Sequence, residues 1–339
     1  MASATAPSPS GATVLLTGGG GAALPALITR LRARGHRVLV VDADPHAAGL
    51  YLADRGFRIP LASDPAFPEA LRRILRAESV HALVPLVDEE LLPAARVAGE
   101  EEIALIAPRP EFTALCLDKH ALMRRLAEVG LPAPPTRLLS EGWEGLPFPL
   151  ILKPRVGRGS RGVFVARSPE ALRAQLMETP RDGASTLVQP FVEGTEYTVS
   201  VVAWRDGRVR AVVPKEVVDK RGITRIAITR RHAGIDRLGR EIQRRLAPDG
   251  PFNVQLRVAA ATGDLVPFEI NPRFSTTVTL TQEAGVDEVG GLVDLAIGRG
   301  EPSADWPWRE GVTLIRRTLD AFLDVGEYER RRAGLEQAP

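Results

Sequence analysis

Several features that would narrow the function are scarce in this sequence. A single cysteine, Cys116, excludes an internal disulfide and favours a cytoplasmic protein. The formal net charge of +2 at pH 7 gives no indication of binding to nucleic acid or to an anionic membrane. No apolar run is long enough to span a bilayer, and no internal repeat is found. No Ser-His-Asp or Cys-His arrangement indicates a protein nucleophile.

The composition is that of a soluble globular protein. Hydrophobic residues make up 44% and charged residues 25% of the sequence. A chain of 339 residues is too long for one ordinary core, so we expect two or three lobes. Residues 1–11, MASATAPSPSG, lack the basic and apolar regions of a signal peptide, so we expect a disordered tail there.

Residues 12–112 alternate strand-like and helix-like runs, which predicts an open parallel sheet with helices on its faces. Loops at the carboxyl ends of parallel strands meet at one edge of the sheet. There the glycine run 18–21, Asp42, Asp88 and Glu89 would form one wall of a substrate pocket. Asp88 and Glu89 would equally suit a helix N-terminus, where carboxylates complement the dipole. The glycine run has a GxGxxA spacing, so a dinucleotide site using Asp42 is an alternative.

Residues 113–185 combine helix-like and strand-like runs. A helix is expected from Thr113 to about Val129, followed by a proline-rich linker and a strand that ends at Pro154. The basic, glycine-rich loop 155–162 lies between two strands and lacks the Gly-Lys-Ser/Thr ending of a Walker loop. Such a loop can still close over a triphosphate with backbone N–H groups, while Lys153 supplies a point charge. A flexible basic surface loop is the plainer alternative.

Residues 186–325 contain most of the remaining strand-like runs. In the segment QPFVEGTEY, residues 189–197, Pro190 interrupts the strand, and backbone groups around it could pair with a flat ligand. A β-hairpin follows, with its turn at Asp206-Gly207. Residues 220–231 are expected to be irregular, and the charged tail 326–339 is expected to be frayed.

The stretch 253–275 predicts a second hairpin, and its loop length decides what Gln255 meets. If a three-residue loop ends in Gly263, Ala260 pairs with Asp264 and Gln255 lies opposite Glu269. A two-residue loop places Gln255 opposite Ile270 and on the other face. The first register gathers oxygen donors from Gln255, Glu269 and Asn271, which suit Mg²⁺. A solvated polar edge is the alternative.

Taken together, Lys119, Lys153, the loop 155–162, QPFVEGTEY, Gln255 and EINPR (residues 269–273) resemble, in this order, the ATP-grasp superfamily. The NVQ and EINPR motifs are most similar to the branch of the carbamoyl-phosphate synthase large chain, here as one ATP-grasp unit. The resemblance covers about residues 10–300. It implies a pre-ATP-grasp domain (12–112), a small lobe (113–185), a large lobe (186–325) and a charged tail (326–339).

The resemblance implies an ATP- and Mg²⁺-dependent ligase that converts a carboxylate to an acyl phosphate and couples it to an amine or similar nucleophile. A homodimer and Mn²⁺ in place of Mg²⁺ are left open. The implied nucleotide-binding residues are Lys119, Lys153, Gly157, Gly159, Ser160, Gly162, Gln189, Pro190, Phe191, Val192, Glu193 and Glu196. The implied metal ligands are Gln255, Glu269 and Asn271; Arg273 and Lys153 are catalytic; Asp88, Glu89, Lys220 and Arg221 face substrate.

Two other functions use part of the same sequence. A nicotinamide-dependent dehydrogenase would use the GxGxxA turn but would leave the EINPR hairpin unexplained. A non-catalytic nucleotide-binding module would not need Lys153, Glu269 and Asn271 together.

Overall fold

The computed structural model describes residues 11–157, 159, 161–300 and 305–335, so the predicted disordered tail falls almost entirely outside the described residues. The chain divides into two compact units. The first comprises Met1–Ala107, Asp287–Ala304 and Leu319–Pro339, and the second Pro108–Val286 and Asp305–Thr318. The division differs from the predicted lobes because segments beyond Val286 return to the first unit.

The first unit has the predicted open parallel sheet, with strand order β3-β2-β1-β4-β5. Its strands are β1 Thr13–Thr17, β2 Arg37–Asp42, β3 Arg55–Arg58, β4 Ala82–Val84 and β5 Ala104–Leu105. Its helices are α1 Leu24–Ala33, α2 Ala48–Leu52, α3 Phe67–Ala77, the 3₁₀ helix Asp88–Glu90, α4 Leu91–Glu100, α10 Glu288–Ala296 and α11 Val325–Leu335. Helices α3 and α4 bury Phe67, Ile74 and Val97 against Leu15 and Leu39 of the sheet.

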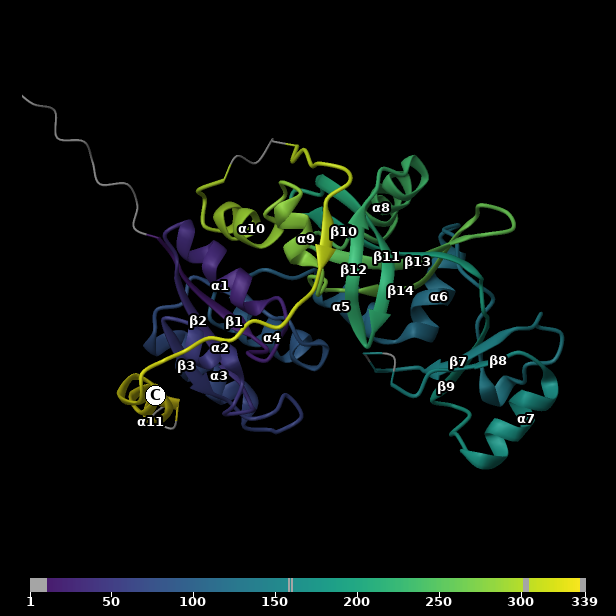
Figure 1. The fold of residues 1–339 in the computed structure, drawn as a ribbon, viewed down its shortest axis with the longest axis horizontal. Coiled ribbons are helices and arrows are strands. Elements are labelled where there is room, and N and C mark those ends of the chain that lie inside the picture. Colours follow the sequence, from purple (N-terminus) through teal and green to yellow (C-terminus); the bar gives the residue numbers. More distant parts are fainter. Residues whose placement is uncertain (1–10, 158, 160, 301–304, 336–339) are drawn as a thin grey trace, which may run out of the picture. The chain divides into compact units, whose positions relative to one another are not determined.

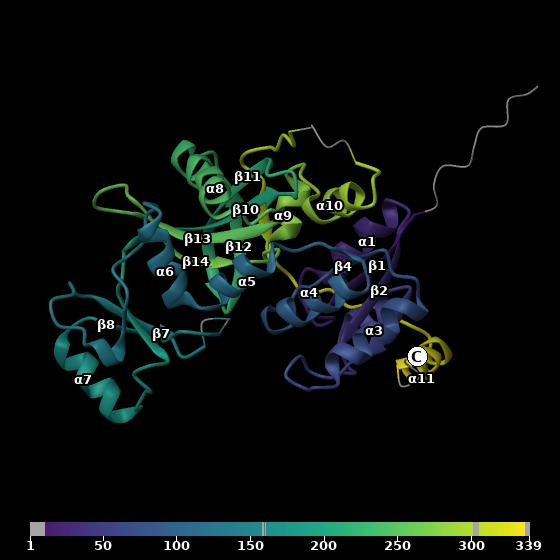
Figure 2. The same ribbon diagram turned by 180° about the vertical axis from the view of Figure 1, so that it is seen from behind.

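The second unit contains two antiparallel sheets, labelled in Figures 1 and 2. The four-stranded sheet has the order β6-β9-β7-β8, from β6 Arg137–Leu138, β7 Leu150–Pro154, β8 Phe164–Ala166 and β9 Thr186–Pro190. The six-stranded sheet has the order β14-β13-β10-β11-β12-β15. Its strands are β10 Gly194–Ala203, β11 Val209–Arg221, β12 Ile223–Thr229, β13 Phe252–Ala259, β14 Leu265–Asn271 and β15 Thr313–Ile315.

The helices of the second unit pack against both of its sheets. They are α5 Pro110–Leu117, α6 Lys119–Glu128, α7 Pro169–Glu178, α8 Ala233–Leu246, α9 Val278–Glu283 and the 3₁₀ helix Leu139–Glu141. Tyr197, Val199 and Leu256 point into a core with α6 and α8, which lies along the sheet in Figure 1. Alternate strand residues point to the opposite face, which is therefore free to carry polar groups. Cys116 lies in this core, where burial raises the pKa of its thiol.

The predicted continuous helix from Thr113 to Val129 is two helices, α5 and α6, and that prediction was wrong. Asp118 has extended backbone angles between them, and its carboxylate accepts hydrogen bonds from the N–H groups of His120 and Ala121. An N-terminal aspartate of this kind starts a new helix because it satisfies free donors of the first turn. The break makes Lys119 the first residue of α6.

The hairpin of β13 and β14 pairs Gln255 with Glu269, as predicted, but by a different route. The turn is closed by the N–H of Ala259, which donates to the Asp264 carbonyl, rather than by Ala260. The register then shifts between Gln255 and Leu256, because Leu256 faces Pro267 and leaves Phe268 outside the ladder as a β-bulge. A turn one position longer and a bulge therefore cancel, and the carboxylate meets the amide.

Two segments expected to be irregular have regular structure. Residues 223–229 of the stretch 220–231 form β12, which pairs with β11 and β15. The predicted charged tail contains α11, which packs on the first unit. The rings of Tyr328 and Tyr51 stack with centroids 5.3 Å apart, Arg331 donates to the Ala53 carbonyl, and Leu335 is buried. The many charged residues of this segment indicated a frayed tail, but its few apolar side chains pack against residues that are distant in sequence.

We expect Tyr328→Ala to loosen α11 without unfolding the sheet of the first unit. An aromatic pair contributes about 0.5–1.5 kcal/mol beyond its buried area, enough to raise the open population of this helix severalfold. Limited trypsin digestion at Arg330, Arg331 and Arg332 should speed up by that factor. Glu329→Ala, exposed on the same helix, is the control. Equal cleavage rates for Tyr328→Ala and wild type would mean that the stacking does not hold α11.

Candidate functional site

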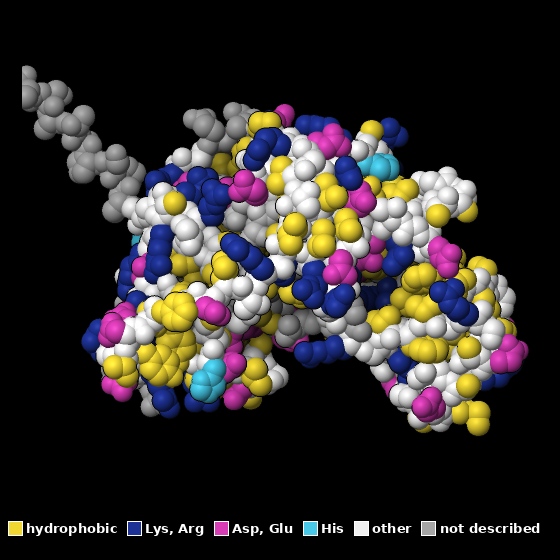
Figure 3. All heavy atoms as spheres, viewed as in Figure 1, with side chains coloured by type: hydrophobic (Ala, Val, Ile, Leu, Met, Phe, Trp, Pro, Cys, Tyr) yellow, Lys and Arg dark blue, Asp and Glu magenta, His cyan; other side chains and the backbone are white. Residues whose placement is uncertain are grey.

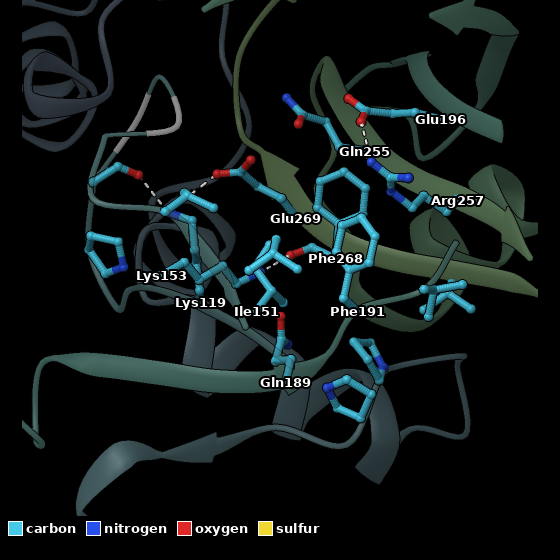
Figure 4. A pocket seen from close by; sticks show the side chains of 18 of the residues that line it. Lys119, Ile151, Lys153, Gln189, Phe191, Glu196, Gln255, Arg257, Phe268 and Glu269 are labelled. Atoms are coloured by element: carbon cyan, nitrogen blue, oxygen red, sulfur yellow. Dashed lines mark hydrogen bonds and ion pairs between the residues drawn. The ribbon is translucent and has the colours of Figure 1, made fainter. Parts of the chain in front are cut away.

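A cavity of about 530 Å³ in the second unit is lined by residues of both sheets and the segments between them. Figure 4 shows side chains from β7, β9, β10, β13 and β14 converging on it. Twelve residues singled out in the sequence line this cavity: Lys119, Lys153, Gly157, Gly159, Gln189, Pro190, Phe191, Val192, Glu196, Lys220, Gln255 and Glu269. Motifs spread over some 150 positions thus meet at one place.

Other predicted residues lie outside the lining. Glu193 is exposed and forms an ion pair with Arg167, at 3.5 Å. Gly162 offers its carbonyl to Arg181. Asn271, Arg273 and Arg221 belong to the same unit but do not line the cavity, while Asp88 and Glu89 belong to the other unit. Ser160 lies outside the described residues.

One end of the cavity holds two ammonium groups and one carboxylate. Lys153, on β7, donates from Nζ to the carbonyl of Phe268 at 2.8 Å. Lys119 Nζ donates to the Gly157 carbonyl at 2.5 Å and lies 3.3 Å from Glu269 Oε1. The pKa of Lys153 is lowered from 10.5 to about 8. Burial is the main cause, Glu269 opposes the shift, and Lys119 adds to it. A buried ammonium with a lowered pKa is a group that gains from an anionic ligand.

The β-bulge explains why Lys153 has a partner here. Phe268 is out of the ladder, so its carbonyl is free to accept from the neighbouring sheet. Pro267, next to it, has no N–H to lose, which makes the bulge tolerable at this point. The bulge therefore links the register of the hairpin to the position of Lys153.

The polar face of the hairpin presents carboxylate and amide oxygens. Gln255 and Glu269 face each other on β13 and β14, and Asn253 and Asn271 form the next pair. Asn271 donates to the side-chain oxygen of Asn253 at 3.3 Å, so its own oxygen is oriented away from that contact. Among the described residues there is no cluster of three or more His, Cys, Asp or Glu side chains. The set fits Mg²⁺ that takes its remaining ligands from phosphate oxygens.

The glycine-rich loop starts from a well-anchored base. The Arg155 side chain donates to the Asp118 carboxylate at 2.6 Å, and the Lys119 N–H donates to the Arg155 carbonyl. Gly157 and Gly159 have φ values of 141° and 69°, which residues with side chains rarely adopt. The loop is thus tied to the N-terminus of α6 at its base, while its glycines face the cavity.

The other end of the cavity is apolar, and the motifs did not identify it. Ile151 and Val165 come from the four-stranded sheet, and Val266 and Phe268 come from β14. Ile151 and Lys153, like Val266 and Phe268, are two positions apart and so share a face. This spacing is the one feature of the sequence that could have identified these residues. The same spacing is found in strands whose apolar face packs in a core, so it does not distinguish the two cases. Phe191 and Val192 complete this apolar slot.

Glu196 lies between two cations. Its Oε1 accepts from Lys220 Nζ at 2.7 Å. Its Oε2 accepts from Arg257 Nη2 at 3.1 Å (Figure 4). Arg257 lines the cavity and lies in the predicted hairpin 253–275, but the sequence gave it no role in the site. The sequence predicted both strands, β10 and β13, but it did not show that they pair and bring Arg257 next to Glu196.

The first unit places its predicted residues at the carboxyl edge of the parallel sheet. The Asp42 carboxylate accepts from the N–H groups of Gly20 and Asp44, which closes the glycine turn internally. Asp88 and Glu89 form a 3₁₀ turn after β4. Asp42 therefore has a structural partner in its own loop.

Figure 3 shows acidic and basic side chains interspersed over the molecular face in view. Within the described chain, no helix has the length and apolarity needed to cross a bilayer.

Two family models match this chain. One, described as ATP-grasp in the biosynthetic pathway with Ter operon, matches residues 183–318. The other, the PylC-like N-terminal domain, matches residues 14–106. The first covers the six-stranded sheet that carries the oxygen donors, and the second covers the parallel sheet.

Relatives and solved structures agree with these models. The carbamoyl-phosphate synthase of Methanobrevibacter smithii is 24% identical, over 79% of this chain and 77% of its own. The formate-dependent phosphoribosylglycinamide formyltransferase of Azotobacter vinelandii is 26% identical, over 80% and 72%. The biotin carboxylase domain of the Hydrogenobacter thermophilus 2-oxoglutarate carboxylase, with MgADP, aligns with TM-score 0.70 at 17% identity, over 88% of this chain and 72% of its own.

An L-amino acid ligase from Bacillus licheniformis aligns with TM-score 0.67 at 16% identity, over 85% of this chain and 75% of its own. At these identities the structural likeness establishes the fold, and the family models identify the domains. The chain therefore contains an ATP-grasp domain, with a PylC-like N-terminal domain in front of it.

Proposed function

We propose that this protein is an ATP- and Mg²⁺-dependent ligase that activates a carboxylate as an acyl phosphate and joins it to an amine or similar nucleophile. The observation that carries the proposal is one cavity with two ends of opposite character. One end has Lys153 and the ion pair of Lys119 with Glu269, and the other is an apolar slot. A nucleoside triphosphate has the same two ends.

The nucleotide occupies the cavity along its length. The apolar slot takes the base, and the backbone of residues 189–192 faces its edge, since Pro190 ends the β9 ladder there. Glu196 accepts from the ribose hydroxyls. Lys119 and Lys153 hold the phosphates, together with Gly157, Gly159 and Gly162 of the glycine-rich loop. Ser160 keeps the nucleotide-binding role that the sequence resemblance implies. The exposed ion pair of Glu193 with Arg167 supports no direct nucleotide contact.

Gln255, Glu269 and Asn271 are proposed to hold Mg²⁺, with Mn²⁺ as a substitute. The metal supplies charge neutralisation between the phosphates. Because the protein provides a single carboxylate among these three residues, the phosphate oxygens must complete the ligand set. Glu269 also lies 3.3 Å from Lys119, so it orients this ammonium as well as the metal.

The reaction proceeds in two steps. An oxygen of the substrate carboxylate attacks the γ-phosphorus, the bond to the β,γ-bridging oxygen breaks, and ADP leaves. The amine then attacks the acyl carbon, phosphate departs, and the amine loses a proton. Arg273, two residues beyond Asn271, is proposed to stabilise the phosphoryl group or the acyl phosphate. Positioning and charge compensation carry this chemistry, so no protein nucleophile is needed.

The acceptor and acyl substrates are proposed to be small molecules. Asp88, Glu89, Lys220 and Arg221 remain the proposed substrate contacts, and the pairing of Lys220 with Glu196 supports a place for this lysine next to the nucleotide. We place the protein in the cytoplasm, with a homodimer as a possible assembly and without a nucleic-acid or membrane partner. The dehydrogenase alternative is weaker because Asp42 is engaged within its own glycine turn.

A ligand comparison tests the proposal. Mg-ATP should raise the unfolding temperature by mass action, and NADPH should not. Release of ADP should then appear only when a carboxylate and an amine are added together from crossed panels. Stabilisation by NADPH but not by Mg-ATP would overturn the ligase in favour of the dehydrogenase.

Glu269→Ala should reduce Mg²⁺-dependent ATP turnover at least a hundredfold, because the change removes the carboxylate among the proposed metal ligands. The fold should persist, since the residue lies at the cavity and its loss creates no core void. Glu178→Ala, exposed on α7, is the matched control. Turnover and its Mg²⁺ dependence measured by ADP release decide the matter, and unchanged turnover would move the metal elsewhere.

The lowered pKa of Lys153 predicts opposite pH effects on binding and stability. As the pH rises through about 8 the folded protein loses this proton before the unfolded chain does, so stability rises from pH 8 to 10.5. Nucleotide binding needs the ammonium, so the Kd for Mg-ATP should rise over the same range, about tenfold in total.

Calorimetric titrations between pH 7 and 10 measure that dependence. Lys153→Arg keeps the charge to much higher pH and should flatten the profile while retaining most of the affinity. Lys153→Met should flatten it at low affinity. A Lys153→Met profile that still follows the wild-type one would exclude Lys153 as the titrating group.

A further inference from the structure

Arg257, on β13, contacts the segment 191–196 that connects the two sheets of the second unit. It lies on β13 directly across from Glu196 on β10. Its guanidinium makes three contacts to residues 191–196: Nη2 donates to Glu196 Oε2 at 3.1 Å, Nη1 donates to the Gly194 carbonyl at 3.3 Å, and its central carbon lies 4.7 Å from the centre of the Phe191 ring. A planar guanidinium that stacks and donates at once has little freedom left.

The segment that Arg257 contacts is itself sharply bent. The Phe191 N–H donates to the Pro149 carbonyl, and Gly194 begins β10 with φ at 151°. A Cβ at Gly194 would lie 2.0 Å from the Val258 carbonyl oxygen, so no other residue fits. The backbone between Phe191 and β10 is thus constrained by the close contact of Gly194 with β13. The Arg257 guanidinium adds a hydrogen bond to Gly194, at the end of this segment next to β10.

Glu196 is held, but it is not saturated. A carboxylate has about four acceptor sites, and Lys220 and Arg257 each take one, on different oxygens. The side chains of Glu196, Lys220 and Arg257 are 15%, 27% and 24% exposed, so water does not dissolve these pairs as it does on an open surface. One further donor can therefore reach each oxygen from the cavity, in an orientation that two cations set.

We propose that Arg257 is a positioning residue for ribose recognition, which rests on the nucleotide function proposed above. It holds Glu196 so that one oxygen accepts from the 2′-hydroxyl and the other from the 3′-hydroxyl. The site then prefers ATP to 2′-deoxy-ATP, because the deoxy sugar leaves one oriented carboxylate oxygen without its donor. Without the guanidinium the carboxylate follows Lys220 alone and loses this orientation.

The test compares the Kd values of Mg-ATP and Mg-2′-deoxy-ATP by calorimetry. Wild type should prefer ATP about tenfold or more, the size expected of one hydrogen bond to a charged group. Arg257→Met, which keeps an unbranched stem, should bind ATP about tenfold more weakly and bring the preference close to one. Arg257→Lys should recover part of the affinity. Glu196→Gln should lose the preference in the same way.

Arg240→Met is the matched control. Arg240 on α8 also donates to a carboxylate, that of Asp236, and to a backbone carbonyl, that of Val209, but it does not line the cavity. It should change neither Kd. A wild type that binds both nucleotides equally would overturn the inference alone, and so would an Arg257→Met protein that weakens both in the same ratio. A wild type that binds no Mg-ATP would overturn the proposed function itself.

Discussion

The hydrogen bond from Lys153 to the carbonyl of Phe268 is the interaction on which the site depends. It joins β7 of the small sheet to β14 of the large one, across 115 positions of sequence. The bond exists because Phe268 bulges out of its ladder, and the same bulge restores the register that places Gln255 opposite Glu269. One local irregularity therefore sets both the position of the Lys153 ammonium and the pairing of Gln255 with Glu269.

The six-stranded sheet separates stability from chemistry by its pleat. Tyr197, Val199 and Leu256 bury one face against α6 and α8, where large apolar side chains supply the driving force for folding. Glu196 and Gln255, out of step by one residue, face the cavity. The carboxylate and the amide are thus kept out of the apolar core, where their burial would be costly. Burial of Lys153, with its pKa near 8, shows the cost that remains before a ligand arrives.

The predictable part of the site came from residues with unusual chemistry in fixed order. Lys153 before a glycine loop, Pro190 inside a strand and the EINPR motif each have a physical reason to stand out. Ile151, Val165 and Val266 do not, since an apolar strand residue facing a slot has the same pattern as one facing a core. Arg257 was missed because its role comes from the strand opposite. The break at Asp118 and the helix α11 were missed because capping and distant packing outweighed local periodicity.

The sequence by itself determined the fold class, the order of the motifs and the ATP-grasp resemblance, because these follow from periodicity and from residue chemistry along the chain. The tertiary structure alone decided which residues meet. It showed that a longer turn and a bulge cancel to pair Gln255 with Glu269, and that Arg257 and Lys220 share Glu196. Register and cross-strand contacts depend on the balance of turn, bulge and burial over the whole sheet, and no local pattern records that balance.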